Sequence, residues 1–148
     1  MNRFIPPYLL LITIVLMIIG SYFLPKLPMA NYVLLISLGI AICLLGTFLV
    51  FSANKQITQN KTEIHTFKEP KKLITDGVFN WSRNPIYLGF LLIDIGVALL
   101  FNNWICLVFP SVFFLICNFW YIPYEENNLE KTFDKEYKDY QYKTRRWI

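Results

Sequence analysis

Charged side chains are scarce in this sequence, and the few that occur are segregated. Asp, Glu, Lys and Arg make up 16% of the 148 residues, against about 25% in an average soluble domain. A soluble domain of this length must cover its core with polar surface, and a chain that is 55% hydrophobic has too little polar sequence to do so. The composition therefore excludes an ordinary soluble domain and favours an integral membrane protein.

Cysteine and histidine are also rare, which argues against two common kinds of site. The three cysteines, Cys43, Cys106 and Cys117, lie within apolar runs. There they act as small hydrophobic residues, and their spacing fits neither a disulfide framework nor a metal site. His65 is the single histidine and lies in a polar segment, where it is either a base or a residue without a role; the second interpretation is the simpler one.

Four runs with almost no charge are present, at residues 4–24, 29–53, 84–101 and 104–124; the single charged side chain within them is Asp94. Each is about long enough to cross a ~30 Å hydrocarbon core as a helix. The first run is too long for a signal peptide and lacks a small-residue cleavage site. We therefore predict an all-α integral membrane protein with four transmembrane helices.

The expected organisation is one membrane domain, 1–148, in four parts. A first helical hairpin covers residues 4–53, a cytoplasmic loop covers 54–83, a second hairpin covers 84–124 and a C-terminal amphipathic helix covers 125–148. Lys and Arg cluster in 55–83 and 131–146, so the positive-inside rule predicts that both termini and the loop are cytoplasmic. This bias, with attraction to anionic lipid headgroups, explains the net charge of +4 without a nucleic-acid partner.

Smaller patterns refine this organisation. Two glycine pairs, Gly39 with Gly46 and Gly89 with Gly96, are each seven residues apart, so each pair lies on one helix face and permits close approach of a neighbouring helix. Pro85 suits the first turn of the third helix, which makes the preceding asparagine a candidate N-cap.

The C-terminal segment has one apolar face, formed by Leu129, Phe133, Tyr137 and Tyr140, at helical spacing. Such a helix either rests on the lipid headgroups or covers a site at the cytoplasmic surface as a lid. The pattern alone favours the headgroup interpretation.

Two sets of polar residues are candidates for chemistry. Arg83 and the pair Glu125–Glu126 lie at the cytoplasmic ends of the third and fourth helices, so a hairpin brings them together. Flanking charges are common at membrane helices, but adjacent carboxylates repel and need compensation from Arg83, Lys131 or a bound cation. Asp94 inside the membrane costs about 2.5 to 3.5 kcal/mol if it is charged, so it is either functional or a protonated residue that bonds a neighbouring helix.

Two blocks of the sequence match a known pattern. The stretch "KKLITDGVFNWSRNPIYLGF" resembles L-V-x-x-G-x-Y followed by R-H-P-x-Y-x-G, and "EENNLEKTFDKEYKDY" resembles E-E-x-x-L followed by F-G-x-x-Y-x-x-Y. These are the signature blocks of the isoprenylcysteine carboxyl methyltransferase and phospholipid methyltransferase superfamily. The resemblance covers residues 71–148. It implies an integral membrane enzyme that transfers a methyl group from S-adenosylmethionine to a lipophilic acceptor taken from the bilayer.

The resemblance also implies a cofactor site. Glutamates suit the ammonium or ribose hydroxyls of S-adenosylmethionine, Arg83 suits its carboxylate, and aromatic side chains such as Phe79, Trp81 and Tyr87 suit its adenine and sulfonium. Arg83 and Asp94 are the expected catalytic residues, Asp94 as a guess for the base that an amine or hydroxyl acceptor needs. The positions that match the family's cofactor-binding residues are Leu73, Ile74, Phe79, Arg83, Asn84, Pro85, Tyr87, Gly89, Glu125 and Glu126.

The chain departs from the pattern at three places. Asn84 replaces the usual His and cannot act as a base, and Asp134 replaces the Gly of F-G-x-x-Y. Residues 115–124 lack the arginines that prenylcysteine enzymes carry before the E-E pair, so the acceptor remains a carboxylate, an amine or a hydroxyl. The alternatives are an NADPH-dependent membrane reductase of the sterol reductase type and a non-catalytic membrane binding protein; the oligomeric state is not predicted.

Overall fold

The computed structural model describes residues 6–25, 27–29, 31–60 and 72–148. His65 lies outside these residues. The described residues contain helices and turns but no strand, which confirms the all-α class. The main elements are α1 (Pro6–Phe23), α2 (Tyr32–Gln59), α3 (Pro85–Leu100), α4 (Val108–Ile116) and α5 (Ile122–Lys143), with 3-10 turns at Gly77–Asn80 and Trp104–Leu107 and a π-helical segment at Cys117–Tyr121.

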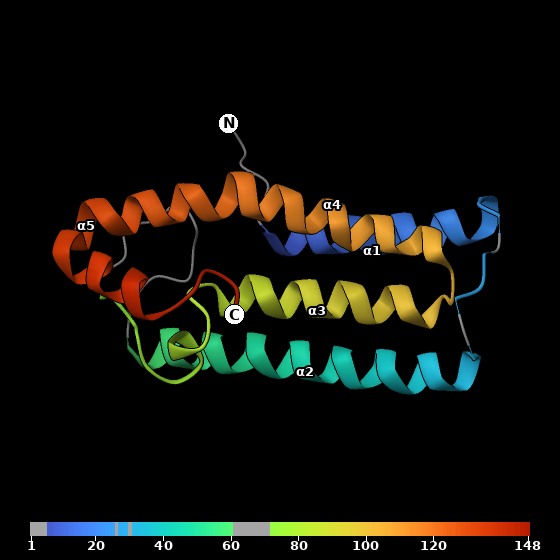
Figure 1. Cartoon of the computed structure of the whole chain (residues 1–148), viewed down its shortest axis with the longest axis horizontal. Coiled ribbons are helices and arrows are strands. Elements are labelled where there is room, and N and C mark those ends of the chain that lie inside the picture. Colours follow the sequence, from blue (N-terminus) through green and yellow to red (C-terminus); the bar gives the residue numbers. More distant parts are fainter. Residues whose placement is uncertain (1–5, 26, 30, 61–71) are drawn as a thin grey trace.

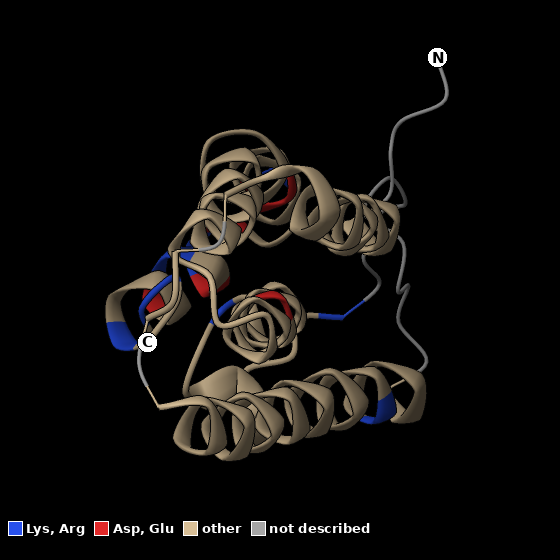
Figure 2. Ribbon diagram, turned by 90° about the vertical axis from the view of Figure 1, so that its right-hand side faces the viewer, with Lys and Arg blue, Asp and Glu red and all other residues tan. Residues whose placement is uncertain are grey.

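Helix α3 lies at the centre of the molecule (Figures 1 and 2). It packs against α2 on one side and against α1 and α4 on the other, and α1 packs mainly on α3 and α4 rather than on α2. The expected first hairpin, 4–53, is therefore wrong as a packed unit. Its two helices are consecutive in the chain, but α3 lies between them.

The closeness of α2 and α3 explains both glycine pairs. A Cβ on Gly46 would lie 2.5 Å from the carbonyl oxygen of Gly89, and a Cβ on Gly39 would lie 2.8 Å from that of Gly96. The two glycine faces meet in a single antiparallel register, because 39 pairs with 96 and 46 pairs with 89. Only residues without a side chain permit this approach of the two backbones.

Within the described part of the chain, three helical stretches are long and apolar enough to cross a membrane: Pro6–Phe23, Tyr32–Gln59 and the continuous stretch Trp104–Lys143. Helix α3 is apolar but shorter, with 16 residues. Many large apolar side chains on α2 are exposed, among them Leu38, Leu44, Leu45, Phe48 and Phe51. Such a surface suits contact with lipid chains rather than with water.

Two of the expected boundaries differ from the structure. The expected loop 54–83 begins as helix, because α2 continues to Gln59. Ala53 and Ile57 are buried on this extension, and Ala53 belongs to a cluster that includes Val78 of the 3-10 turn. Tertiary packing therefore prolongs α2 past the end of its charge-free run.

The second difference is that no break separates 84–124 from the expected C-terminal helix, 125–148. The π-helical segment Cys117–Tyr121 passes directly into α5. The rod, the continuous helical stretch of α4, the π-helical segment and α5, bends instead at Asp134, where φ is +36°. Glycine adopts a positive φ without strain, and the family pattern has Gly at this position. Past Lys143 the chain leaves the helix and runs back toward the start of α3 (Figure 1).

The apolar face of α5 is covered by protein. Tyr137 and Tyr140 are 1% and 6% exposed, and they form a cluster with Leu73, against which Leu129 and Phe133 also pack. This arrangement is the one expected of a lid over the segment before α3. The pattern alone favoured the headgroup interpretation because it does not show that the bend at Asp134 turns this face inward.

Candidate active site

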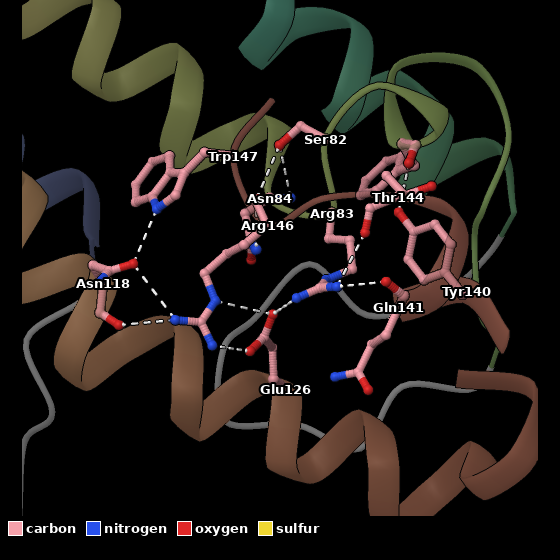
Figure 3. A network of polar contacts seen from close by, with 11 residues as sticks. Ser82, Arg83, Asn84, Asn118, Glu126, Tyr140, Gln141, Thr144, Arg146 and Trp147 are labelled. Atoms are coloured by element: carbon pink, nitrogen blue, oxygen red, sulfur yellow. Dashed lines mark hydrogen bonds and ion pairs between the residues drawn. The ribbon is translucent and has the colours of Figure 1, made fainter. Parts of the chain in front are cut away.

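Three segments far apart in the chain converge at one end of the helices (Figure 3). They are residues 82–87 at the start of α3, residues 118–126 in the π-helical segment and the first turn of α5, and the C-terminal tail, residues 144–147. A continuous set of hydrogen bonds joins them. The hairpin of α3 and α4 accounts for the first two segments, as the sequence predicts. The bend at Asp134 returns the tail to the same place.

Glu126 is at the centre of the network. Its carboxylate accepts a hydrogen bond from Arg83 Nη2 at 2.8 Å on one oxygen. Arg146 donates to both oxygens, from Nη2 at 2.6 Å and from Nε at 3.3 Å. The Glu126 side chain is only 10% exposed and that of Arg83 12%, so solvent screens this pair of bonds weakly. We call Arg83, Glu126 and Arg146 the charged triad.

Arg83 also holds the C-terminal tail. Its Nη1 donates to the backbone carbonyls of Gln141 at 3.2 Å and Thr144 at 3.0 Å, and its backbone N–H donates to the carbonyl of Arg145 at 3.0 Å. These bonds bring the end of the chain against the start of α3. Arg83 is therefore already engaged by protein groups along the edge expected to bind a cofactor carboxylate.

The residues beside Arg83 bind the same tail. Ser82 Oγ and Asn84 Nδ2 donate to the carbonyl of Arg146, at 3.3 and 3.1 Å. Asn84 does stand at the N-cap position before Pro85, but its side chain makes no capping hydrogen bond. The capping prediction is therefore right about the position and wrong about the contact, because the tail carbonyl takes the amide.

Asn118 links the tail to the π-helical segment. Its side-chain oxygen accepts a hydrogen bond from the Trp147 indole N–H at 3.0 Å, and Arg146 Nη1 lies 3.5 Å from this oxygen and from the Asn118 backbone oxygen. The Trp147 ring also packs against Phe114, with ring centroids 5.0 Å apart. Arg146 thus reaches the stretch before the E-E pair, in which the sequence itself has no basic residue.

The two adjacent glutamates have different environments. Glu126 is bound by the two arginines, whereas Glu125 accepts a hydrogen bond from the Tyr87 hydroxyl at 2.8 Å. Glu125 and Tyr87 are both expected site residues, and the structure brings them together. The expected repulsion within the pair is compensated at Glu126 by Arg83, one of the three proposed candidates, and by Arg146, which was not among them.

Leu73 and Phe79 contact the lid formed by α5, and Ile74 follows Leu73 in the same segment. Leu73 and Ile74 are each 8% exposed, and the Phe79 carbonyl accepts a hydrogen bond from the Tyr140 hydroxyl at 2.5 Å. Burial, with a smaller contribution from the nearby charge of Glu126, raises the pKa of Tyr137 to about 12. The lid therefore presents neutral phenols to this segment at physiological pH.

Two expected site residues lie away from this network. The space above Gly89 is filled by Val50 and by the carbonyl of Gly46, so Gly89 serves helix packing. Asp94 is fully buried and accepts a hydrogen bond from Thr13 Oγ1 of α1 at 3.1 Å. Asp94 thus ties α3 to α1, and among the described residues no hydrogen bond joins it to the charged triad.

Sequence reasoning missed Ser82, Asn118, Arg146 and Trp147. Asn118 was hidden because one amide in an apolar run carries little signal. The tail offers a weak signal, since Trp147 directly follows two arginines. Neither feature identifies the partner.

Comparisons with known proteins agree with this fold. A sequence model of the phospholipid methyltransferase family matches residues 34–136. The chain is similar to protein-S-isoprenylcysteine O-methyltransferase B of Arabidopsis thaliana, with 32% identity over 108 residues that cover 69% of this chain and 53% of the relative. It is similar to the Saccharomyces cerevisiae protein-S-isoprenylcysteine O-methyltransferase, with 32% identity over 138 residues that cover 85% of this chain and 55% of the relative.

A solved structure shares the fold. It is a eukaryotic intramembrane Ras methyltransferase, isoprenylcysteine carboxyl methyltransferase, with 26% identity and a TM-score of 0.69 over 96% of this chain and 51% of that one. The fold and site thus define a helical integral membrane protein with a polar site at one end. The chain belongs to the phospholipid methyltransferase family. It spans about half the length of the curated relatives it matches.

Proposed function

We propose that this protein is an S-adenosylmethionine-dependent methyltransferase that acts on a lipophilic acceptor in the membrane. The observation that carries the proposal is the meeting of Arg83, from the R-N-P-x-Y motif, with the Glu125–Glu126 pair at one site. The family and the names of its relatives favour methyl transfer over reduction by NADPH.

The proposed topology has four membrane crossings, by α1, α2, α3 and the rod that contains α4, with both termini in the cytoplasm. Helix α3 is about 24 Å long, since each residue adds about 1.5 Å, and it is enclosed by the other helices. The described parts of the two positive clusters, residues 55–60, 72–83 and 131–146, lie at the end of the molecule that carries the charged triad. This supports a site at the cytoplasmic surface.

The residues present fit S-adenosylmethionine. Glu125, held by Tyr87, is an acceptor for the ammonium group or the ribose hydroxyls, and Phe79 and Tyr87 offer aromatic surface to the adenine and sulfonium. Leu73, which packs beneath the lid, and the adjacent Ile74 would offer backbone groups. Pro85, Asn84 and Arg83 fix the start of α3 on which Tyr87 is carried.

The bound cofactor would supply a methyl group on a sulfonium, ready for displacement by a nucleophile. The chain's own residues orient the reactants and exclude water. The apolar cluster of Tyr87, Phe90, Phe113, Cys117 and Ile122 lies between α3 and the α4–α5 rod. A dry site of this kind strengthens electrostatic interactions and favours alignment over solvation.

Calorimetric titration of S-adenosylmethionine into the detergent-purified protein tests the proposal. We expect saturable binding to wild type and about 10- to 100-fold weaker binding to Glu125→Gln, the effect of one lost charge-assisted hydrogen bond. Glu136→Gln is the matched control, because Glu136 is exposed on the same helix. Absence of binding to folded wild type, with lipid supplied, would reject the methyltransferase proposal. Binding without turnover of any lipid acceptor would leave a non-catalytic binding protein.

A second test concerns Asp94. We expect Asp94→Asn to keep nearly full turnover if the acceptor is a carboxylate, which needs no base, because Asp94 bonds Thr13 rather than the charged triad. The assay is transfer of labelled methyl to extracted membrane lipids and to a prenylated cysteine. Thr13→Val serves as the control, since it removes the same interhelical bond and leaves the carboxyl. A large loss with Asp94→Asn alone would make Asp94 the base for an amine or hydroxyl acceptor.

A further inference from the structure

The Arg146 guanidinium group has one edge that is fully hydrogen-bonded to protein and one edge that makes only long contacts. The edge formed by Nε and Nη2 binds the Glu126 carboxylate at 3.3 and 2.6 Å. Nη1 makes two contacts with Asn118, both at 3.5 Å, which is beyond the usual range for an N–H···O hydrogen bond. This side chain is 35% exposed, so a ligand can reach it without displacing the tail.

Arg83 is placed differently. Its Nη groups are taken by Glu126 and by two backbone carbonyls, and its side chain is 12% exposed. Its Nε is buried and has no hydrogen-bond partner among the described residues. Arg83 therefore serves mainly to hold the tail, and the charged triad has more donors than the protein acceptors around it use.

Charge leads to the same conclusion. Two guanidinium groups and one carboxylate give the charged triad a net charge of +1 in a partly buried place. A net charge with reduced solvation attracts a counterion, and a carboxylate matches a guanidinium edge in shape.

We propose that Arg146 binds the carboxylate of a ligand through its Nη1 side. This inference rests on the proposed methyltransferase function and assigns to Arg146 the role that the sequence suggested for Arg83. Two ligands of such an enzyme can supply the carboxylate, the amino-acid end of S-adenosylmethionine or a prenylated cysteine acceptor. The family match ends at residue 136, so the assignment comes from the contacts of this chain's own tail.

Arg146→Ala distinguishes the two sources, with Arg145→Ala as the matched control. The Arg145 side chain is exposed, and only its backbone carbonyl takes part in the network. Binding of S-adenosylmethionine and of 5′-methylthioadenosine, which lacks the amino-acid end, is measured by calorimetry. The KM and kcat for N-acetyl-S-farnesylcysteine are measured in parallel.

A cofactor carboxylate predicts about 10- to 100-fold weaker binding of S-adenosylmethionine to Arg146→Ala with unchanged binding of 5′-methylthioadenosine. An acceptor carboxylate predicts unchanged cofactor binding and a similar rise in KM with little change in kcat. Equal weakening of both adenosine ligands, or values indistinguishable from those of Arg145→Ala, would overturn the assignment. Wild type that binds no S-adenosylmethionine would instead reject the proposed function, and the inference with it.

Arg146→Lys decides the matter if Arg146→Ala does not fold. Lysine keeps the charge next to Glu126 but loses the planar fork of donors. We expect the same ligand to be weakened by a smaller factor, with 5′-methylthioadenosine again unaffected. Unchanged binding of every ligand to a folded Arg146→Lys protein would contradict a carboxylate held by the guanidinium.

Discussion

Glu126→Gln is expected to destabilise the protein by about 3 kcal/mol, because it leaves two partly buried guanidinium groups without their carboxylate. An amide offers one acceptor, and its NH₂ group would face the other arginine. Arg83 and Arg146 both depend on this side chain, so the substitution also releases the tail from the start of α3. Cofactor binding should be lost together with stability.

The measurement is thermal unfolding in detergent, followed by maleimide labelling of Cys106 and Cys117, which are 1% and 0% exposed in the folded protein. Glu130→Gln is the control on the same helix. Its ion pair with Lys138 is 3.6 Å long and about half exposed, so its loss should cost about 0 to 1 kcal/mol. Equal stability of the two variants would show that the charged triad does not hold the tail.

The sequence predicted the part of the polar site that follows from the order of neighbouring residues and from the hairpin of the third and fourth helices. Arg83 and the Glu125–Glu126 pair were expected to meet because they flank two helices joined by a tight turn, and the structure confirms it for Arg83 with Glu126. Which of the two glutamates Arg83 binds depends on the rotation of α5 about its axis, because consecutive side chains on a helix point about 100° apart. Arg146 could not be predicted, because the path of a short irregular tail is set by tertiary contacts alone.

The helix order shows the same limit. Each glycine pair correctly predicted a face for close packing, but the sequence does not name the partner of each face. Consecutive helices were assumed to pack as a hairpin, which fails for α1 and α2. The matching seven-residue spacing in α2 and α3 is the signal that would have paired them, since antiparallel helices with equal spacing bring both pairs into contact at once.

Gly46→Ala tests the pairing of α2 with α3. We expect this added methyl group to destabilise the membrane region strongly. The added Cβ would lie 2.5 Å from the carbonyl oxygen of Gly89 and 3.0 Å from the backbone N of Ile93. Backbone atoms cannot turn aside as a side chain does, so α2 and α3 must separate. We expect a loss of about 2 to 3 kcal/mol from overpacking, larger than the gain of about 1 kcal/mol that alanine brings to a helix.

Gly20→Ala is the control that separates the gain in helix propensity from the cost of the backbone clash. Its Cβ would meet only the flexible end of Leu24, at 3.0 Å, and the next atoms at 3.7 Å, so the gain in helix propensity should remain with little clash. The same thermal unfolding assay should therefore show Gly20→Ala unchanged or slightly stabilised and Gly46→Ala strongly destabilised. A Gly46→Ala protein as stable as Gly20→Ala would mean that α2 and α3 do not approach this closely. Since Arg83 lies just before α3 and Tyr87 lies in its first turn, the separation that we expect should also weaken cofactor binding.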